Sequence, residues 1–486
     1  MDNKYIDVSS ISKRASESIG LTIREICDSS SIDIKELNIK NKGNIGNLIE
    51  EHWFSIKNNN SPLPDFAEAG IELKVIPLAK NKDNSYFVKE RTKICSIDYH
   101  KLIDEEWDNS HAKIKINKIL FMYYFYDKSD ILNSTIKKID LFELKGNDEL
   151  VISNDWNSVH NYVKEGKAHE LSETISHVLA ASRSGSGGTD KYGVLKDLVS
   201  QPIKTYEDKA LKRAFSLKQS FTNQRWNEIN KKKYESILET LHISNGNFEE
   251  EILSKLKLLE DLTLGEVAKR FNINVPSGKN AAATIIKKSI GFKNVNSRIK
   301  EFEQLGIQVK TISTRKSDFK PWEAVSFPTF KLKELVKEQW DEGIDEEEGL
   351  TWERCSFKEE INRILFIPIL KNEKEGVPTD EKVIGKAFFW SPSSTELEII
   401  KKEWGNYIDE INNGKVEITR KPIKNGYKEI SKLSKESDTK VIHIRPHSKD
   451  RKDRDEDHLG NSIVKQSFWL NKNFLQKLLK NNYNIS

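Results

Sequence analysis

Three polar residues in the first half of the chain have the types and spacing to hold a divalent cation beside a reactive water. Asp65, Glu72 and Lys74 follow the pattern D-x6-E-x-K. Residues 71–76 alternate apolar and polar side chains, which predicts a half-buried strand with Glu72 and Lys74 on one face, about 7 Å apart. Asp65 would arrive from the preceding turn. Two close carboxylates repel unless a cation lies between them, and phosphodiester hydrolysis needs a cation and an oriented water.

An E-x-K spacing is weak evidence when it stands alone. Glu165/Lys167 and Glu207/Lys209 have it too, and we interpret both as solvated surface. The strand pattern and the upstream aspartate distinguish the set around Glu72. Carboxylate oxygens are the hard ligands that Mg²⁺ prefers, so the set predicts Mg²⁺, with Mn²⁺ as a substitute.

The elements that would position these residues can be read from local patterns. Gly70 and Pro77 are expected to bracket the strand, and the apolar, aromatic run 118–126 predicts a central strand. Residues 42–53 have helical apolar spacing, and Phe215–Phe221 suggest a late helix or a strand-to-helix turn. Strands flanked by helices predict an α/β class, a mixed sheet with flanking helices.

The sequence contains one internal repeat, with a period of about half the chain. Four segments of the first half recur in the same order in the second: 21–26 at 262–267, 65–76 at 301–312, 116–121 at 361–366, and 215–221 at 468–474. One such match could be chance in a lysine-rich chain, but four in order predict a duplicated domain. We predict a first domain at 1–230, a linker at 231–250 and a second domain at 251–486.

The second copy keeps the apolar frame and loses the charge pattern. Glu301, Gln308 and Lys310 stand where the first copy has Asp65, Glu72 and Lys74, and Lys287 stands where it has Glu50. Glutamine keeps the shape of glutamate without its charge. The second copy is therefore predicted to be a degenerate site that holds Mg²⁺ poorly.

Composition sets wide bounds. The 486 residues carry a formal net charge of +4, with 32% charged and 36% hydrophobic residues, as in a folded globular protein. The three cysteines, Cys27, Cys95 and Cys355, have no metal-ligand or disulfide spacing. No run approaches the roughly 18 apolar residues of a membrane span, and the N-terminus lacks a secretory apolar core. We expect a cytoplasmic protein that does not bind membranes.

The segment Asp65–Pro77 closely resembles the active-site segment of the MutH family of endonucleases. Lys42–Glu50 and Ser110–Leu120 are similar to two further segments of that family, as is the Phe-x-Leu-x-x-x-Phe element near the end of each half. A two-copy chain of this size resembles the GATC-cutting type II restriction enzymes of the family rather than its single-domain repair enzymes.

The resemblance implies a PD-(D/E)xK restriction-endonuclease-like fold, here duplicated in tandem, and a role for each matched residue. Asp65, Glu72 and the carbonyl of Leu73 would be metal ligands, and Lys74 would position or deprotonate the water. Glu50 and Lys115 match accessory active-site residues. Ser216 stands where the repair enzyme carries a tyrosine that senses adenine methylation, and Trp469 stands there in the second copy, which argues against such sensing in the first copy.

Candidate DNA contacts are spread over both copies. They are Lys42, which matches a lysine near the DNA backbone, Arg183 and Lys191 around a glycine-rich loop, Lys218, Arg445, Lys449 and Trp469. Arg445 lies in an Ile-Arg-Pro segment similar to one before the family's DNA-reading segment. The loop around Arg183 and the charged run from Lys449 could equally be solvated surface. Trp469 could stack on a base or fill the core, and core filling is the commoner role.

These observations predict a type II site-specific deoxyribonuclease that cuts double-stranded DNA at a short site such as GATC, leaving 5′-phosphates. Its second copy would bind DNA and regulate. One active site per chain predicts self-association on DNA, and a restriction system implies a cognate DNA methyltransferase with no stable complex. Alternatives are a modification-dependent or nicking repair endonuclease of the same family, or a non-catalytic DNA-binding regulator.

Overall fold

The computed structural model describes most of the chain. The described residues are 7–29, 43–56, 62–80, 85–88, 90–127, 129–184, 197–203, 208–232, 234–237, 248–276, 278, 280–292, 298–340, 353–423 and 426–484. For residues 43, 44, 298, 353, 354, 423, 426 and 428 only the backbone is described. No helix in these ranges is long and apolar enough to cross a membrane.

The helices, in chain order, are α1 (Val8–Glu17), α2 (Ile23–Ser29), α3 (Gly43–Leu48), η2 (Ile49–Trp53), α4 (Tyr99–Leu102), η3 (Trp107–Asn109), α5 (His111–Ile116), η4 (Ile131–Asn133), α6 (Asn147–Lys164), η5 (Ala168–Glu170), η6 (Glu173–Ile175), α7 (Gln219–Ile229), α9 (Phe248–Lys257), α10 (Leu264–Arg270), α11 (Ala281–Ser289), α12 (Lys300–Gln304), α13 (Leu332–Leu335), α14 (Ser356–Glu360), η8 (Thr379–Glu381), α15 (Ser394–Asn412), η9 (Glu436–Asp438) and α16 (Lys472–Asn482).

The strands are β1 (Glu72–Lys80), β2 (Tyr86–Val88), β3 (Thr92–Ser96), β4 (Lys118–Phe125), β5 (Thr135–Glu143), β6 (Leu179–Arg183), β7 (Leu198–Ser200), β8 (Lys209–Leu211), β9 (Arg213–Leu217), β10 (Tyr234–Glu235), β11 (Arg298–Ile299), β12 (Ile307–Arg315), β13 (Val325–Thr329), β14 (Glu338–Gln339), β15 (Glu353–Arg354), β16 (Arg363–Lys371), β17 (Val383–Ile384), β18 (Phe388–Trp390), β19 (Ile418–Ile423), β20 (Gly426–Ser431), β21 (Ile442–Pro446), β22 (Arg454–Glu456), β23 (Ser462–Val464) and β24 (Gln466–Leu470).

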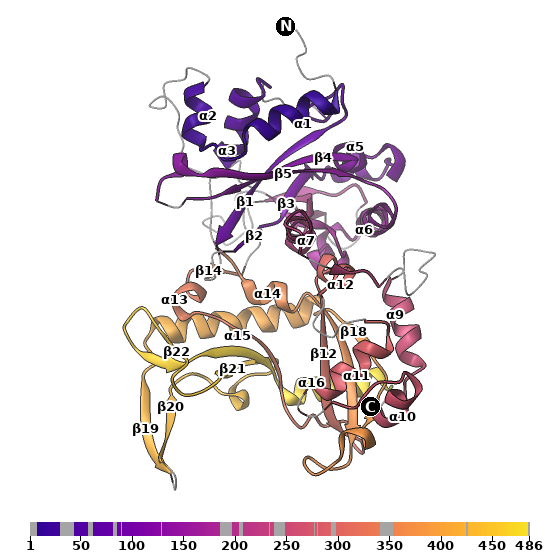
Figure 1. Cartoon of the computed structure of the whole chain (residues 1–486), viewed down its shortest axis with the longest axis vertical. Coiled ribbons are helices and arrows are strands. Elements are labelled where there is room, and N and C mark those ends of the chain that lie inside the picture. The colour runs from indigo at the N-terminus through magenta and orange to yellow at the C-terminus, as the bar shows by residue number, and fades with distance from the viewer. Residues whose placement is uncertain are drawn as a thin grey trace. The chain divides into compact units, whose positions relative to one another are not determined.

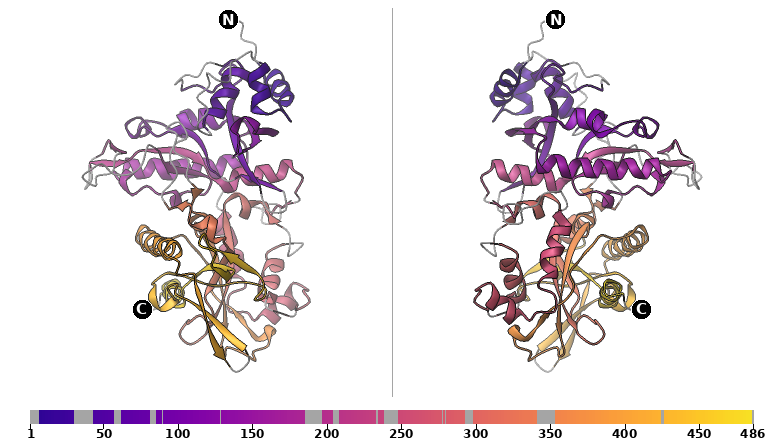
Figure 2. Two further views of the ribbon diagram at one scale, coloured as in Figure 1. Left: turned by 90° about the vertical axis from the view of Figure 1, so that its left-hand side faces the viewer. Right: turned by 90° about the vertical axis from the view of Figure 1, so that its right-hand side faces the viewer.

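The chain forms two compact units. The first contains the described residues of Met1–Lys233 with Glu303–Leu305, and the second contains most of the remainder, beginning at Tyr234. Each unit is built largely from one stretch of the chain, indigo to magenta for the first and pink to yellow for the second (Figures 1 and 2). Both mix strands and helices, so the predicted α/β class is confirmed.

In the first unit, a four-stranded mixed sheet has the order β2-β1-β4-β5. β1 runs parallel to β4, and β5 is antiparallel to β4, so the apolar run 118–126 is the predicted central strand. A second, antiparallel sheet has the order β3-β9-β6. The helices α1, α2 and η2 pack on one face of β1 and β4 through apolar side chains that include Ile11, Ile26 and Ile49.

The predicted strand around Glu72 is confirmed, but its predicted end at Pro77 is wrong. β1 continues through Pro77 to Lys80, with Pro77 opposite Tyr124 of β4. On its other side β1 pairs with β2 only from Leu78 onward. Proline lacks the N–H that a second neighbouring strand would require, and this edge position does not require it.

The second unit repeats the parallel central pair of the first unit in the same register, while its described part has no strand that corresponds to β2. β12 runs parallel to β16 with Gln308 opposite Ile364, as Glu72 lies opposite Ile119. The sheet β13-β24-β21 corresponds to β3-β9-β6, followed in each case by a C-terminal helix, α16 or α7. Gly70 and Gly306, at the matching turns before β1 and β12, have φ of 63° and 65°, a conformation that favours glycine.

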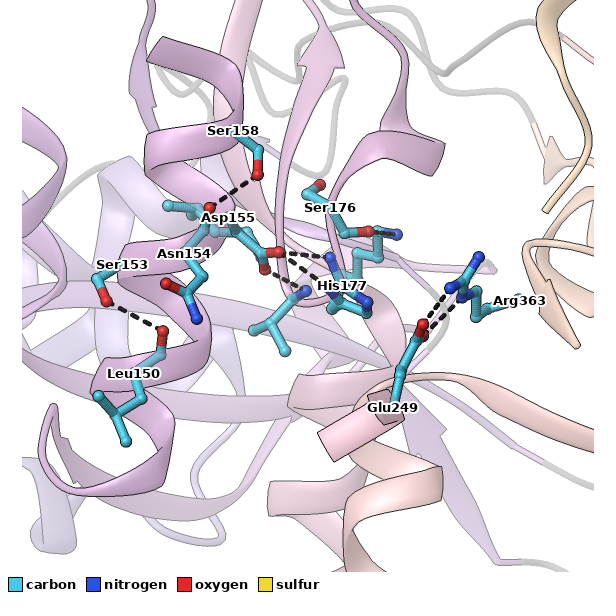
Figure 3. Close-up of polar contacts among 12 residues, drawn as sticks. Leu150, Ser153, Asn154, Asp155, Ser158, Ser176, His177, Glu249 and Arg363 are labelled. Carbon is cyan, nitrogen blue, oxygen red and sulfur yellow. Dashed lines mark hydrogen bonds and ion pairs between the residues drawn. The ribbon is translucent and has the colours of Figure 1, made fainter. Parts of the chain in front are cut away.

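A buried carboxylate at matching places ties a long helix to a strand in each unit. Asp155 of α6 accepts hydrogen bonds from the backbone N–H groups of His177, Val178 and Leu179, at 2.7, 2.6 and 2.8 Å, and so fixes the start of β6 (Figure 3). Glu403 of α15 accepts from Val441 and Ile442 at 3.1 and 2.9 Å, at the start of β21.

Candidate active site

A tight turn brings Asp65 against the first residues of β1. Phe66 and Ile71 form an antiparallel bridge across the turn, and Gly70 adopts its positive φ there. Asp65 Oδ2 accepts a hydrogen bond from the backbone N–H of Leu73 at 2.8 Å. The aspartate is thus held beside Glu72, as the spacing predicts.

Glu72 is the centre of the cluster. Its side chain is only 3% exposed, and its two oxygens accept from Lys74 Nζ at 2.7 Å and Lys115 Nζ at 2.9 Å. Lys115 comes from the last turn of α5, which leads into β4, the parallel neighbour of β1. A buried carboxylate needs such charged partners because burial without them is costly.

Glu50 lies in η2, a helical turn with π-type hydrogen bonding. Burial, and next the negative charge of Asp65, raise the pKa of Glu50 to about 7. Burial and the charge of Glu72 likewise raise the pKa of Asp65. Burial alone would lower the pKa of Lys74, but Glu72 and Asp65 outweigh it and raise that pKa, so Lys74 is an ammonium at neutral pH.

Besides burial, which is the main cause, neighbouring carboxylates contribute to these raised pKa values, so the carboxylates of the cluster repel one another. A hard divalent cation would relieve that repulsion, and Asp65, Glu72 and the peptide carbonyl of Leu73 are oxygen donors of the type it takes. Among the described residues, no group of three or more His, Cys, Asp and Glu side chains has the arrangement to hold a metal ion by itself. Two carboxylates and a carbonyl would leave coordination positions for water, of which Mg²⁺ usually keeps several.

The four residues predicted to form a degenerate second site are not gathered as their counterparts are. Glu301 accepts from Ser236 Oγ at 2.5 Å and from the N–H of Ile237 at 3.1 Å. Lys310 donates to the carbonyl of Ser326 at 3.0 Å, and burial lowers its pKa. Lys287 lies 5.8 Å from the ring of Phe292.

Gln308 donates instead to Glu360, a residue that sequence reasoning missed. In the alignment of the two halves, Glu360 is the counterpart of Lys115, because Glu360 directly precedes Ile361 and Lys115 directly precedes the matching Ile116. In the first unit a carboxylate meets an ammonium, and in the second a neutral amide meets a carboxyl group whose pKa is raised by burial. The carboxyl group of the pair thus lies on the strand in the first unit, at Glu72, and on the helix in the second unit, at Glu360.

The chain is similar to known restriction and mismatch-repair proteins. The family model described as "DNA mismatch repair enzyme MutH" matches residues 54–155 and 343–403, that is, the cluster around Glu72 and a segment largely in the second unit. The chain is 28% identical to the type II restriction enzyme Sau3AI of Staphylococcus aureus, over 97% of this chain and 98% of that one. It is 28% identical to the DNA mismatch repair protein MutH of Actinobacillus pleuropneumoniae, over 35% of this chain and 70% of that one.

The chain is thus similar to MutH-like proteins and, along nearly its whole length, to a type II restriction enzyme. The match to the restriction enzyme covers almost all of both chains, whereas the match to the repair protein covers about a third of this chain. The E-x-K pair Glu165/Lys167 lies on the surface as predicted, with both side chains about half exposed; Glu207 lies outside the described residues.

The predicted DNA contacts of the first unit are placed as follows. Lys42 and Lys191 lie outside the described residues. Arg183, at the end of β6, is largely buried, with Nη2 3.8 Å from Asp197 Oδ2. Lys218 is buried and donates to the carbonyl of Ser176 at 2.5 Å, so a DNA contact would require it to leave that carbonyl.

In the second unit, Arg445 and Trp469 form a stack on neighbouring strands. Arg445 is exposed at the end of β21, with its guanidinium carbon 4.4 Å from the Trp469 ring centroid. The Trp469 ring is half-buried and also faces His447, at 5.1 Å between ring centroids. At the equivalent positions the first unit has Ser182 and Ser216, whose hydroxyls are 2.6 Å apart. Lys449, another candidate DNA contact, follows Arg445 by a few residues in the sequence, and it is exposed.

Proposed function

We propose that this chain hydrolyses phosphodiester bonds of double-stranded DNA at a short specific site, GATC, in restriction. The similarity to the restriction enzyme Sau3AI and to the MutH family model supports a site-specific deoxyribonuclease. The observation that carries the chemistry is the cluster at the start of β1, in which Asp65, Glu72, Lys74 and Lys115 converge.

Asp65, Glu72 and the Leu73 carbonyl would hold Mg²⁺, or Mn²⁺ in its place. When bound, the cation supplies Lewis-acid activation of water and neutralises charge on the phosphate. Each Glu72 oxygen accepts one hydrogen bond from a lysine, and its second lone pair would be open to a cation.

The side chains then have separate tasks in the reaction. Lys74, an ammonium with a raised pKa, orients the attacking water and stabilises the developing phosphate charge. With a cation bound to Asp65 and Glu72, the charges that raise the pKa of Lys74 would be neutralised, so that Lys74 could first release its proton to solvent and then accept one from the attacking water. Water attacks phosphorus as the bond to O3′ breaks, and O3′ takes a proton from solvent, which leaves a 3′-hydroxyl and a 5′-phosphate. Lys115 holds Glu72 in place, and Glu50 adds negative charge beside the cluster.

The test is cleavage of an unmethylated plasmid with known GATC sites in Mg²⁺, beside a Glu72→Gln variant. Discrete fragments ending at GATC are expected from the wild type. Glu72→Gln should cut at least about 10³-fold more slowly, because the neutral amide cannot hold a cation between the carboxylates. Cutting by both proteins alike would contradict the proposed site, and cutting by neither would contradict the function.

A second prediction uses the raised pKa of Glu50, about 7 against an ordinary 4.5. Between these pH values the unfolded chain releases the proton while the folded chain keeps it, so the metal-free protein should lose stability as pH rises from 4.5 to 7. Glu50→Gln should remove that contribution, a gain on the order of 1–3 kcal/mol at pH 8.

The measurement is urea unfolding of the metal-free protein against pH. Glu51→Gln is a matched control, since the neighbouring Glu51 side chain is 45% exposed. Added Mg²⁺ should stabilise the wild type more than Glu50→Gln, because it relieves the same repulsion. An identical pH dependence in the wild type and Glu50→Gln would show that Glu50 ionises freely.

We further propose that the two units arose by tandem duplication and have diverged in role. The equal registers of β1/β4 and β12/β16 support a shared origin. The catalytic domain would be 1–230, with a linker at 231–250 and a catalytically inactive, DNA-binding and regulatory domain at 251–486. One active site per chain would require two chains to meet on DNA, or rebinding, to cut both strands. A cognate methyltransferase would protect the host sites.

The Arg445–Trp469 stack supports DNA binding by the second unit. Trp469→Ser, which copies Ser216 of the first unit, should weaken binding of a GATC duplex by about tenfold if the ring stacks on a base, since such stacking contributes about 1–3 kcal/mol. Binding is measured by fluorescence anisotropy in the Glu72→Gln background, which does not cut the probe. If the ring only fills space, Trp469→Ser should lower the unfolding midpoint and leave the affinity unchanged.

A further inference from the structure

The second unit contains a β-hairpin between α15 and β21, and the described residues between α6 and β6 of the first unit contain no such hairpin. β19 and β20 pair antiparallel with each other, and with no further strand in the described part of the chain. The hairpin lies between α15 and β21 and projects from the second unit (Figure 1). In the first unit, residues 165–178 connect α6 to β6 through only the short turns η5 and η6.

The register of the hairpin separates its side chains onto two faces. Arg420 lies opposite Glu429, and Pro422 lies opposite Tyr427, on one face. Lys421, next to Arg420 in sequence, lies on the other. An isolated two-stranded hairpin gains little stability by itself, so a projecting one needs another reason to be present.

The first face stacks two guanidinium groups on one tyrosine. The guanidinium carbon of Arg420 lies 4.6 Å from the Tyr427 ring centroid, and that of Arg451 lies 5.3 Å from it. The Arg420 side chain is 61% exposed. We call these three residues the arginine–tyrosine face. Stacking holds the guanidinium planes in place while their N–H groups still point outward.

Glu429, the carboxylate opposite Arg420 on this face, lies 3.7 Å from Arg420 Nε and is bound more closely by a third arginine, Arg454. Glu429 Oε2 accepts from Arg454 at 3.0 Å, and Arg454 also donates to Ser462, so the pair anchors the hairpin to β22 and β23. Three arginines thus meet one glutamate, which leaves an excess of positive charge.

The aspartates in the loop that carries Arg451 are bound to other groups. Asp450 accepts from the backbone N–H of Lys452 at 2.7 Å and of Asp453 at 3.1 Å, and Asp453 pairs with Lys465. The mixed charge of the run from Lys449 is therefore not a uniformly solvated surface, because its carboxylates are engaged locally.

We propose that the arginine–tyrosine face binds the phosphate backbone of duplex DNA held by the second unit. The proposal rests on the proposed DNA-binding function of that unit and extends it to a new surface. Fixed guanidinium groups suit phosphate oxygens, and such contacts set the position of the duplex without reading its sequence. Arg445 of the Trp469 stack lies near the end of β21, and Arg451 lies in the segment that leads from β21 to β22. Contacts to bases and contacts to the DNA backbone would thus come from neighbouring parts of the chain.

The test uses the full chain with Glu72→Gln, so that the duplex is bound and not cut. Anisotropy titrations at several salt concentrations compare this parent with a form that also carries Arg420→Gln and Arg451→Gln. We expect at least about tenfold weaker binding at 0.1 M salt, and a salt slope smaller by about two, since each lost phosphate contact removes about one. The loss should be equal for duplexes with and without GATC.

Two further forms control the result. Lys421→Gln removes a charge from the opposite face of the same hairpin and should leave affinity and slope near those of the parent. Arg420→Lys with Arg451→Lys keeps both charges and should keep most of the slope, which separates lost charge from a disturbed fold. An equal loss in Lys421→Gln, or a collapsed slope in the lysine form, would overturn the proposal.

Failure of this proposal can be told apart from failure of the proposed function. If the chain with Glu72 intact cuts plasmid DNA while the double glutamine form binds as its parent does, the hairpin proposal fails and the nuclease stands. If the parent binds no DNA, both fail.

Discussion

Lys74→Ala is expected to slow DNA cleavage by about 10²- to 10⁴-fold, the usual contribution of a group that positions or deprotonates the attacking water. Lys74 Nζ lies 2.7 Å from Glu72 Oε1, at the point where the carboxylates converge. Lys115 would still neutralise Glu72, so the fold and the cation affinity should change little. The measurement is the single-turnover rate on a GATC duplex, with the Mg²⁺ titration midpoint determined in the same assay.

The chain offers a matched control for this substitution. Lys310 has the register position in β12 that Lys74 has in β1, but it donates to the carbonyl of Ser326 and lies 5.0 Å from the Phe327 ring. Lys310→Ala should leave the cleavage rate within about twofold of the wild type. Comparable losses in both variants would mean that Lys74 acts through general stability or charge and not through the reaction.

The second large effect is expected on stability. Asp155→Ala should destabilise the first unit by about 3–5 kcal/mol, because it leaves three backbone N–H groups at the start of β6 without their acceptor. Asp155 is 1% exposed, so water cannot readily replace the lost carboxylate. Asp155→Asn keeps one acceptor oxygen and should cost less.

Hydrogen exchange followed by mass spectrometry localises this effect. Asp155→Ala should speed exchange in peptides that cover β6 and β9, and Glu403→Ala, its counterpart, should do so in β21 and β24. Each variant should leave the other unit's peptides nearly unchanged. An Asp155→Ala protein with wild-type urea midpoint and exchange would show that the N–H groups find other partners.

Local pattern was enough to predict β1 and β4. Alternation over residues 71–76 predicts a strand with one buried face, and the continuous apolar run of 118–126 predicts a strand buried on both faces. Both predictions use the two-residue period of side chains along a strand. The same local information placed Asp65 beside Glu72, because a turn of a few residues leaves little conformational choice. The repeat was also evident, since four ordered matches need no structure.

Only the tertiary structure decided which side chains meet across elements. Lys115 reaches Glu72 because β4 pairs parallel to β1 in one register, and a shift of one residue would turn Glu72 to the other face. Lys218 was a candidate DNA contact in the sequence, yet its side chain lies buried and donates to the Ser176 carbonyl.

The predicted degenerate site of the second unit shows the same dependence on tertiary structure. Its sequence showed that Gln308 replaces Glu72, but not that Gln308 would turn to Glu360, or that Glu301 would instead bind Ser236 and Ile237. Partners of this kind are brought together by long-range pairing and packing. A side chain's type limits what it can bind, while the fold determines which groups lie within its reach.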